Sequence, residues 1–147
     1  MSGRPGLDEL IRQARVSGDV SAFNDAVPYM RFLGTEFRRG AGGPALCMPF
    51  QPKLIGNPNL PALHGGVTGA LLESAAIATV ILEVEAPRLP KIVNISIDYL
   101  RPGRPADTYA WGRITRLGRR IVNVHASAWQ DDPENPIATA SSRFLIG

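Results

Sequence analysis

The chain has 147 residues, of which 44% are hydrophobic and 20% are charged, and its formal net charge is +3. This length fits one domain with a single core, because two separate domains would each be marginally stable. A lone cysteine, Cys47, excludes an internal disulfide and a site held by several thiolates. The segment Met1–Asp8 has no basic stretch leading into an apolar run, so we expect no signal peptide and a cytoplasmic protein.

The positive charge comes mainly from arginines, which are spread along the chain instead of forming one basic run. Aromatic residues make up only 7% of the chain. Proteins that bind nucleic acid without sequence preference usually interleave basic and aromatic residues on one surface. The sequence therefore disfavours nucleic-acid binding, and a small phosphorylated ligand would account for some of the arginines equally well.

The first part of the chain is predicted to contain two helices and two short strands. Apolar spacing indicates a helix over 7–16, which ends at Gly18, and a second helical segment from Ser21, as its N-cap, to about Met30. Short strands are expected over 33–39 and 45–50, on either side of a glycine-rich turn. Prolines and asparagines make the segment 51–63 a loop with fixed bends.

A long helix, about 65–85, is the strongest element that the sequence predicts. Its residues are apolar on every face except for Glu73 and a few small polar side chains. Such a helix is either a buried core helix or a membrane span. A carboxylate near the bilayer centre costs roughly 2.5 kcal/mol or more, and the apolar run is shorter than the ~20 residues of a usual span. We therefore predict a core helix and no membrane association.

The remaining sequence alternates between apolar and polar residues, as antiparallel strands do. Strands are expected over 93–99, 109–114, 122–128 and 137–146, with turns near Gly103, Gly118 and Pro133. A sheet that wraps around one central helix would bury the helix on most sides and also satisfy this alternation. The predicted fold class is therefore α+β, with an antiparallel sheet around the long helix and extra helices at the N-terminus.

Two features of the long helix suggest chemistry. Glu73 is a carboxylate among apolar residues, which is costly unless it is paired, hydrogen-bonded or protonated, and such groups often mark functional sites. The equally weighted alternative is a glutamate that bonds a loop amide or reaches a gap in the sheet. Before it, His64, Gly65 and Gly66 lead into the helix. Their exposed N–H groups could hold an oxyanion, and a simple helix cap is the alternative.

The two features are separated along the helix. Glu73 lies eight residues after Gly65, which is ~12 Å along the helix axis. One ligand can therefore reach both only if it lies along the helix or if a partner subunit completes the pocket.

The segment 57–73 resembles the signature of the PaaI-type hotdog acyl-CoA thioesterases, and of the 4-hydroxybenzoyl-CoA thioesterases that use a glutamate. In that family His-Gly-Gly opens the central helix and an Asp or Glu follows nine positions after the histidine, as Glu73 follows His64. The segment 94–102 also resembles a strand of this family. The resemblance covers approximately 32–146 and implies a hotdog domain over 32–147, preceded by a helical extension over 1–31.

The resemblance also implies a reaction, the hydrolysis of an acyl-CoA or aryl-CoA thioester. The Gly65 amide would polarise the thioester carbonyl, and Asn57 and His64 would help to place it. Glu73, supplied by the other subunit of a dimer, would either activate water or attack the carbonyl to form an anhydride. The expected assembly is a homodimer or homotetramer with sites at the interface. Neither route needs a cofactor or a metal.

The substrate contacts follow less directly from the pattern. The family's amide residue stands six positions before the histidine, where this chain has Pro58, so Asn57 or Asn59 is the candidate. Tyr99 is interpreted as sheet packing. The candidate substrate and coenzyme A ligands are Gly66, Asn59 and four arginines at strand ends and turns, Arg101, Arg104, Arg119 and Arg120.

Two other functions compete with this one. A non-catalytic acyl-CoA-binding module on the same fold would keep the helix and the arginines, but Glu73 would be dispensable. A hotdog hydratase would need an Asp and a His within one short loop, and neither Asp98 nor Asp107 has a neighbouring histidine. The carboxylate at position 73 favours the thioesterase.

Overall fold

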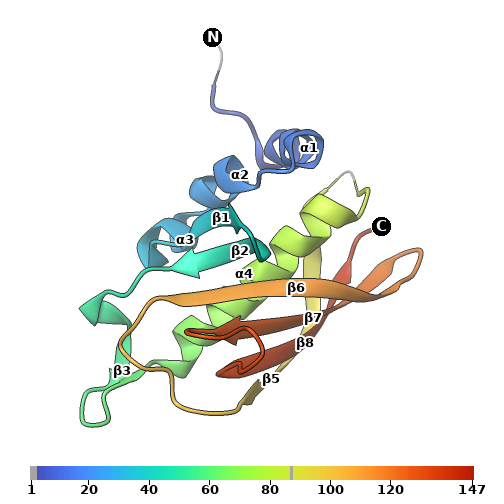
Figure 1. Ribbon diagram of the computed structural model, residues 1–147. Coiled ribbons are helices and arrows are strands. Elements are labelled where there is room, and N and C mark those ends of the chain that lie inside the picture. Colours follow the sequence, from blue (N-terminus) through green and yellow to red (C-terminus); the bar gives the residue numbers. More distant parts are fainter. Residues whose placement is uncertain (1–2, 87) are drawn as a thin grey trace.

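The chain forms three helices at its N-terminus, one long central helix, and strands before and after it (Figure 1). The computed structural model describes residues 3–86 and 88–147. The helices are α1 (Leu7–Ser17), α2 (Ser21–Ala26), α3 (Pro28–Leu33) and α4 (Gly65–Glu83), with one turn of 3-10 helix at Pro52–Leu54. The strands are β1 (Glu36–Gly40), β2 (Gly43–Met48), β3 (Ile55–Asn57), β4 (Ala62–Leu63), β5 (Lys91–Tyr99), β6 (Thr108–Leu117), β7 (Ile121–Trp129) and β8 (Ala138–Leu145).

Six of the strands form one antiparallel sheet in the order β1-β2-β6-β7-β8-β5. The first strand after the central helix, β5, therefore lies at an edge of the sheet beside the last strand, β8. Lys91 pairs with Leu145 at one end of β5, and Tyr99 pairs with Ala138 at the other. The short strands β3 and β4 form a separate hairpin just before α4.

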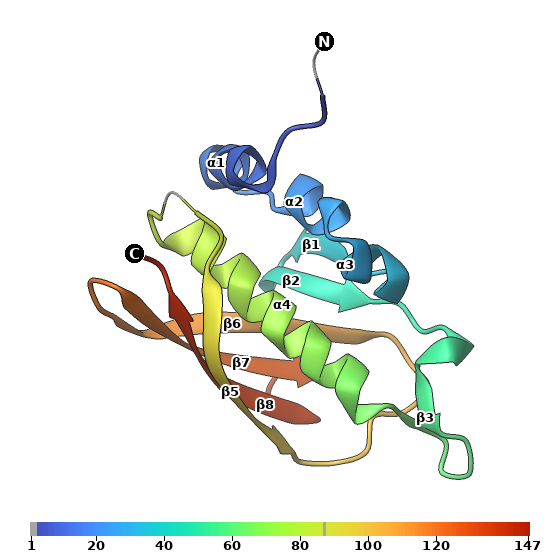
Figure 2. The same cartoon turned by 180° about the vertical axis from the view of Figure 1, so that it is seen from behind.

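The central helix lies along one face of the sheet, as Figure 2 shows from behind. Alternate residues of β7 point toward it and are buried, namely Val122, Val124, Ala126 and Ala128. Its own buried residues include Leu71, Leu72, Ala75 and Val80. The helix is long and apolar enough to cross a membrane, and its packing against the sheet gives the same apolar composition a role in the core. The predicted α+β plan with a long core helix is confirmed.

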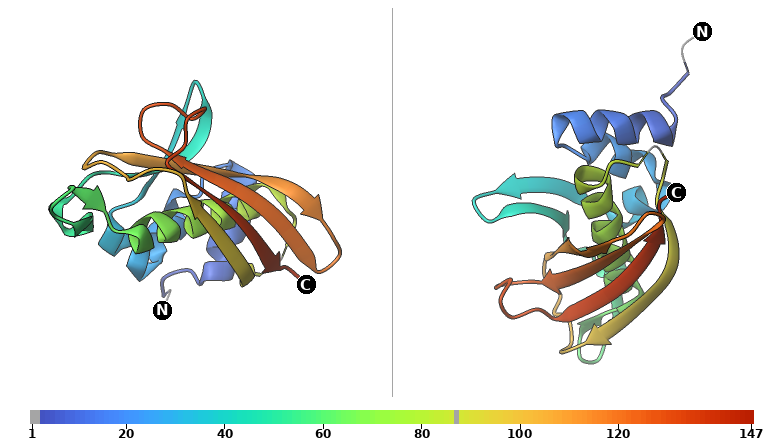
Figure 3. Two further views of the ribbon diagram at one scale, coloured as in Figure 1. Left: turned by 90° about the horizontal axis from the view of Figure 1, so that it is seen from below. Right: turned by 90° about the vertical axis from the view of Figure 1, so that its right-hand side faces the viewer.

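The N-terminal helices belong to the same hydrophobic core as the sheet and α4. Leu10, Ile11, Phe23 and Met30 are buried in one cluster with α4 and the sheet. Figure 3 shows α1, in dark blue, lying across the C-terminal end of α4, with the other N-terminal helices further along α4. Arg15 of α1 also bonds to the segment after α4, where its Nη2 donates to the Ala86 carbonyl oxygen at 2.8 Å. The helices thus cover part of α4 that the sheet leaves free, and a domain boundary between residues 31 and 32 stays a prediction.

The second predicted helix is divided by its proline. Val27 is extended (φ −86°, ψ 115°) and ends α2, while Pro28 opens α3. A proline favours the first position of a helix because its missing N–H is not needed there. Ser21 is not the N-cap that we predicted. Instead, Asp19 Oδ1 accepts from the Ser21 N–H at 2.8 Å.

One buried hydroxyl joins α4 to the sheet. Thr79 is fully buried, donates to the Ala75 carbonyl oxygen at 2.8 Å and accepts from the Gly112 N–H at 3.2 Å. Gly112 lies in β6 beyond the residues that pair with β2, so this N–H has no strand partner on that side. Thr79 thus completes the hydrogen bonding of β6 where its pairing with β2 stops.

Replacing Thr79 with valine is expected to lower the free energy of unfolding by about 1–3 kcal/mol, because a buried N–H loses its acceptor. Urea unfolding of both proteins measures this difference. Thr79→Ser keeps the hydroxyl and removes only a methyl group, so its loss should be smaller. Equal losses in the two variants would show that the hydrogen bond to Gly112 contributes nothing.

Candidate active site

The first turn of α4 is capped by the side chain of His64. Its backbone is extended (φ −64°, ψ 129°), and its ring Nδ1 accepts from the Gly66 N–H at 2.8 Å. Because Nδ1 is an acceptor, the ring proton of the neutral imidazole lies on Nε2. A Cβ at Gly66 would approach His64 Nδ1 and Cε1 to 2.9 Å. A side chain at position 66 would therefore push the His64 ring out of this cap.

The cap leaves one backbone donor of the first turn available. The N–H groups of Val67 and Thr68 bond to the His64 carbonyl oxygen at 3.1 and 3.3 Å, and Gly66 bonds to the ring. Among the described residues, the Gly65 N–H has no acceptor, and Gly65 is exposed. A free N–H at the positive end of a helix is a ready donor for an anionic oxygen.

Tyr99, at the end of β5, holds this turn in place. Its hydroxyl donates to the Gly65 carbonyl oxygen at 2.7 Å. A Cβ on Gly65 or Gly69 would lie 3.4 or 3.5 Å from the Tyr99 hydroxyl oxygen, so the ring packs directly on these glycines. The sequence pattern indicated only sheet packing for Tyr99. The aromatic residue before the Arg101-Pro102 bend was the one available signal, and the contact itself joins residues 34 positions apart.

A cavity of about 390 Å³ opens beside this turn. It lies between the start of α4 and the segment that follows β5, and its lining includes Gly65, Thr68, Tyr99, Arg101 and Ile137. A volume of this size is typical of small-molecule sites. Gly65, with its free N–H, and Arg101 therefore line the same cavity.

Glu73 lies two turns further along α4 and is half-buried. Gly65, Gly69 and Glu73 are spaced by four residues, so they follow one side of the helix. On that side, Gly69 packs against Ile97 and Tyr99 of β5, since a Cβ added to it would lie 3.0 Å from Ile97 Cδ1 and 3.5 Å from the Tyr99 hydroxyl oxygen. No hydrogen bond of the Glu73 carboxylate is formed within 3–86 and 88–147. The Glu73 carboxylate and the free Gly65 N–H thus lie on the same side of α4, about two helical turns apart.

Asn57 and Asn59 lie in the β3–β4 hairpin, and both are exposed. The Asn57 Oδ1 accepts from the backbone N–H of Asn59 at 3.0 Å and of Leu60 at 3.4 Å. The side-chain oxygen of Asn57 is therefore used to form the turn, and its side-chain NH₂ group is the part left for a ligand. The hairpin lies directly against His64. At Gly56 the two segments are so close that an added Cβ would lie only 2.6 Å from the His64 Cα.

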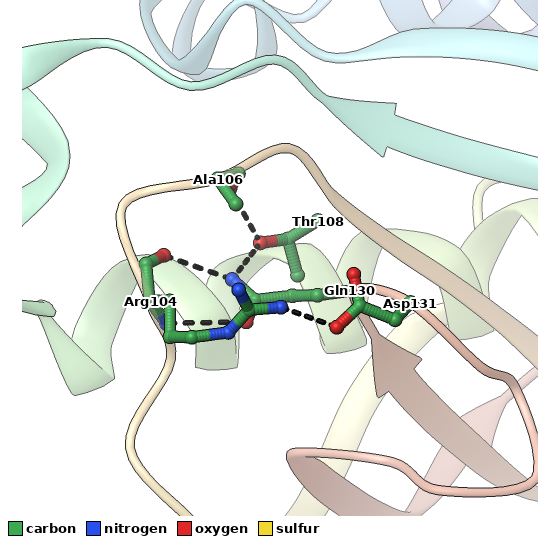
Figure 4. Close-up of polar contacts among 5 residues, drawn as sticks. All are labelled: Arg104, Ala106, Thr108, Gln130 and Asp131. Carbon is green, nitrogen blue, oxygen red and sulfur yellow. Dashed lines mark hydrogen bonds and ion pairs between the residues drawn. The ribbon is translucent and has the colours of Figure 1, made fainter.

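Arg101 and Arg104 follow β5 near the start of α4, and the second of them is already paired. Figure 4 shows Arg104 in an ion pair with Asp131 and its backbone bound to Gln130. Gln130 Nε2 donates to the Arg104 carbonyl oxygen at 2.9 Å and to Thr108 Oγ1 at 3.1 Å. Arg101 lines both the cavity beside Gly65 and a neighbouring one that includes Arg104.

Arg119 and Arg120 lie at the other end of the molecule, in the turn between β6 and β7 (Figure 1). They line a cavity of about 630 Å³ together with Arg116 and Arg143. This cavity and the start of α4 lie at opposite ends of β5. Ile121, in the cavity wall, and Lys91, the first residue of β5, both pair with Leu145, whereas Tyr99, at the other end of β5, contacts Gly65. The sequence singled out two of these four arginines, and the other two are brought in by strand pairing.

Cys47 is not accessible for a role as a nucleophile. It lies in β2 and is fully buried. Burial raises the pKa of the Cys47 thiol, so that it stays protonated near neutral pH.

The fold resembles solved structures over nearly its full length. A protein of Chromobacterium violaceum is 35% identical, with a TM-score of 0.75 and coverage of 95% of this chain and 97% of that one. A phenylacetic acid degradation-related protein of Ralstonia eutropha shares the fold at 23% identity, with a TM-score of 0.70 and coverage of 82% of this chain and 91% of that one. These likenesses confirm the predicted hotdog arrangement.

Sequence comparison places the chain in a family of known chemistry. It is 28% identical to the medium/long-chain acyl-CoA thioesterase YigI of Salmonella typhimurium, over 82% of this chain and 86% of that protein. The family model of the thioesterase superfamily matches residues 60–137, more than half of the chain. The matched range contains His64, Gly65, Glu73 and Tyr99, and the predicted enzyme class, a thioester hydrolase, is confirmed at this level. The chain belongs to the thioesterase superfamily.

Proposed function

We propose that the protein hydrolyses medium- or long-chain acyl-CoA thioesters to the free acid and coenzyme A, in the manner of the PaaI-type enzymes. The similarity to YigI supports the chain length. The observation that carries the proposal is the free N–H of Gly65 at the start of α4, on the same side of the helix as Glu73. Its neighbours Gly66 and Val67 are already bonded, so a carbonyl oxygen would meet this one donor.

In the proposed reaction the thioester oxygen accepts from the Gly65 N–H. Glu73 takes a proton from water as the hydroxide attacks the carbonyl carbon, and the N–H stabilises the oxyanion that forms. The C–S bond then breaks, and the proton on Glu73 passes to the departing thiolate. In the alternative route, the Glu73 carboxylate attacks first and water then hydrolyses the anhydride. His64 would orient the substrate through its Nε2–H, with the Asn57 NH₂ group nearby.

The two groups would come from different subunits of a homodimer. Within one chain they stand about 12 Å apart along α4, which is too far for a single carbonyl. The strand β5 has a free edge, and its side chains Ile92, Val93 and Tyr99 are 40%, 54% and 55% exposed. An unpaired apolar edge favours pairing with another strand. A twofold pairing of β5 with its copy would be antiparallel and would bring two α4 helices to one interface.

The same pairing would bring arginines to the substrate. Antiparallel β5 strands place the Lys91 end of one subunit beside the Tyr99 end of the other. The cavity lined by Arg119 and Arg120 would thus lie toward the partner's Gly65, where the phosphates of coenzyme A need cations. Arg101 would contribute from the first subunit, together with Arg104 after release from Asp131.

The test is thiol release from purified protein with acyl-CoAs of increasing chain length, with one aromatic acyl-CoA included. We expect turnover on medium- and long-chain substrates, and a lower KM for each acyl-CoA than for the matching acyl-pantetheine, which lacks the nucleotide phosphates. Equal KM values would remove the arginines from the proposal. Binding of acyl-CoA with no thiol release would contradict hydrolysis and would favour the non-catalytic binding module.

A further inference from the structure

A second, apolar cavity of about 180 Å³ lies between the N-terminal helices and α4. Figure 2 shows α2 and α3 beside α4, on its other side from β5. The cavity is separate from the one beside Gly65 and shares no lining residue with it. Its main walls are Phe23 of α2, Met30 of α3 and Val27 between them on one side, and Ser74, Ile77 and Ala78 of α4 on the other. Leu89, which follows α4, also lines it.

Among the described residues, the polar side chains in the cavity wall already have partners. Asn24 Nδ2 donates to the Thr35 carbonyl oxygen at 3.0 Å and to Thr35 Oγ1 at 3.1 Å. Ser74 Oγ donates to the Ala70 carbonyl oxygen at 2.7 Å within its own helix. A cavity with no free polar group in its wall holds water poorly and accepts apolar molecules. Its chemistry therefore fits a hydrocarbon.

The cavity adjoins the candidate catalytic carboxylate. Ser74 directly follows Glu73, and Ile77 lies one helical turn beyond it. Ile77 therefore stands between the Glu73 side of α4 and the cavity. A chain that starts at a carbonyl carbon beside Glu73 would reach the cavity by passing Ile77 along the helix.

We propose that this cavity binds the alkyl tail of the acyl group, in the subunit that supplies Glu73. The inference rests on the proposed function and adds the element that selects chain length. With about 30 Å³ for each heavy atom, the share of one molecule in liquid water, the cavity of 180 Å³ holds on the order of six chain carbons. Each buried methylene should raise affinity about fourfold, until the cavity is filled.

The test measures binding instead of hydrolysis. S-butyl-CoA and S-dodecyl-CoA are thioethers that the enzyme cannot cleave, and calorimetry gives their Kd values. In the wild-type protein the dodecyl compound should bind at least tenfold more tightly. Val27→Phe fills the cavity and should abolish this preference, mainly by weakening the dodecyl compound. Val16→Phe makes the same exchange at a side chain that is 91% exposed on α1 and should keep the preference.

Three results would overturn the proposal: equal binding of the two thioethers to the wild-type protein, equal weakening of both by Val27→Phe, or no binding of either. If Val27→Phe does not fold, NMR contacts in the wild-type complex decide. The dodecyl tail should then show contacts with the methyl groups of Val27, Met30 and Leu89. If these contacts are missing, the tail binds outside this cavity and the proposal is wrong. Thiol release from acyl-CoA tests the hydrolytic function separately, so either idea can fail alone.

Discussion

Glu73→Gln is expected to lower kcat for acyl-CoA hydrolysis by about a hundredfold or more while the protein stays folded. Glutamine has nearly the shape of glutamate, and the side chain is half-buried with no hydrogen bond to a described residue, so the fold loses little. It cannot take a proton from water or attack a carbonyl. Both proposed routes therefore stop at the same substitution.

The matched control is Glu83→Gln, at the exposed end of the same helix. It removes the same charge from α4 and should leave kcat and KM unchanged. Calorimetry with a non-cleavable thioether should show that Glu73→Gln still binds its ligand. Equal turnover by wild type and Glu73→Gln would remove Glu73 from the reaction.

Local sequence patterns were sufficient to predict single helices and strands, because these depend on residues that are neighbours in the chain. The apolar helix after His-Gly-Gly and the alternating strands β5–β8 appear where the patterns predict them. Periodicity reports whether a residue faces a core, and it carries no information on which segment covers it. The helix was expected to be covered by sheet, whereas Leu10, Phe23 and Met30 of the N-terminal helices share its core.

The candidate site likewise combines features that local sequence predicts with contacts between segments far apart in the chain. The spacing of His64, Gly65 and Glu73 was visible in the sequence, because all three belong to one helix and its cap. The contact of Tyr99 with Gly65, and the gathering of Arg116 and Arg143 with the two predicted arginines, depend on strand pairing and could not be read from local order. The use of Asn57 Oδ1 to form a turn depends on the hairpin geometry in the same way.

Gly65→Pro is expected to lower kcat by about 10²–10³-fold, the usual cost of losing one oxyanion donor. The substitution removes the backbone N–H at the first position of α4, where proline is well tolerated. His64 before it already has the extended backbone that a following proline requires (ψ 129°). The urea midpoint should therefore change little. Gly65→Ala keeps the N–H, and its Cβ would lie 3.4 Å from the Tyr99 ring, so it should retain most activity.

The two inactive variants together test whether the site is shared. In a mixed dimer of Gly65→Pro and Glu73→Gln, a shared arrangement gives one site with both defects and one site with none. Random mixing makes half of the dimers mixed, so about a quarter of the wild-type activity should return. If each subunit used its own Gly65 and Glu73, every site would carry one defect and no activity would return. Recovery on mixing therefore requires the free N–H and the carboxylate to act from different chains.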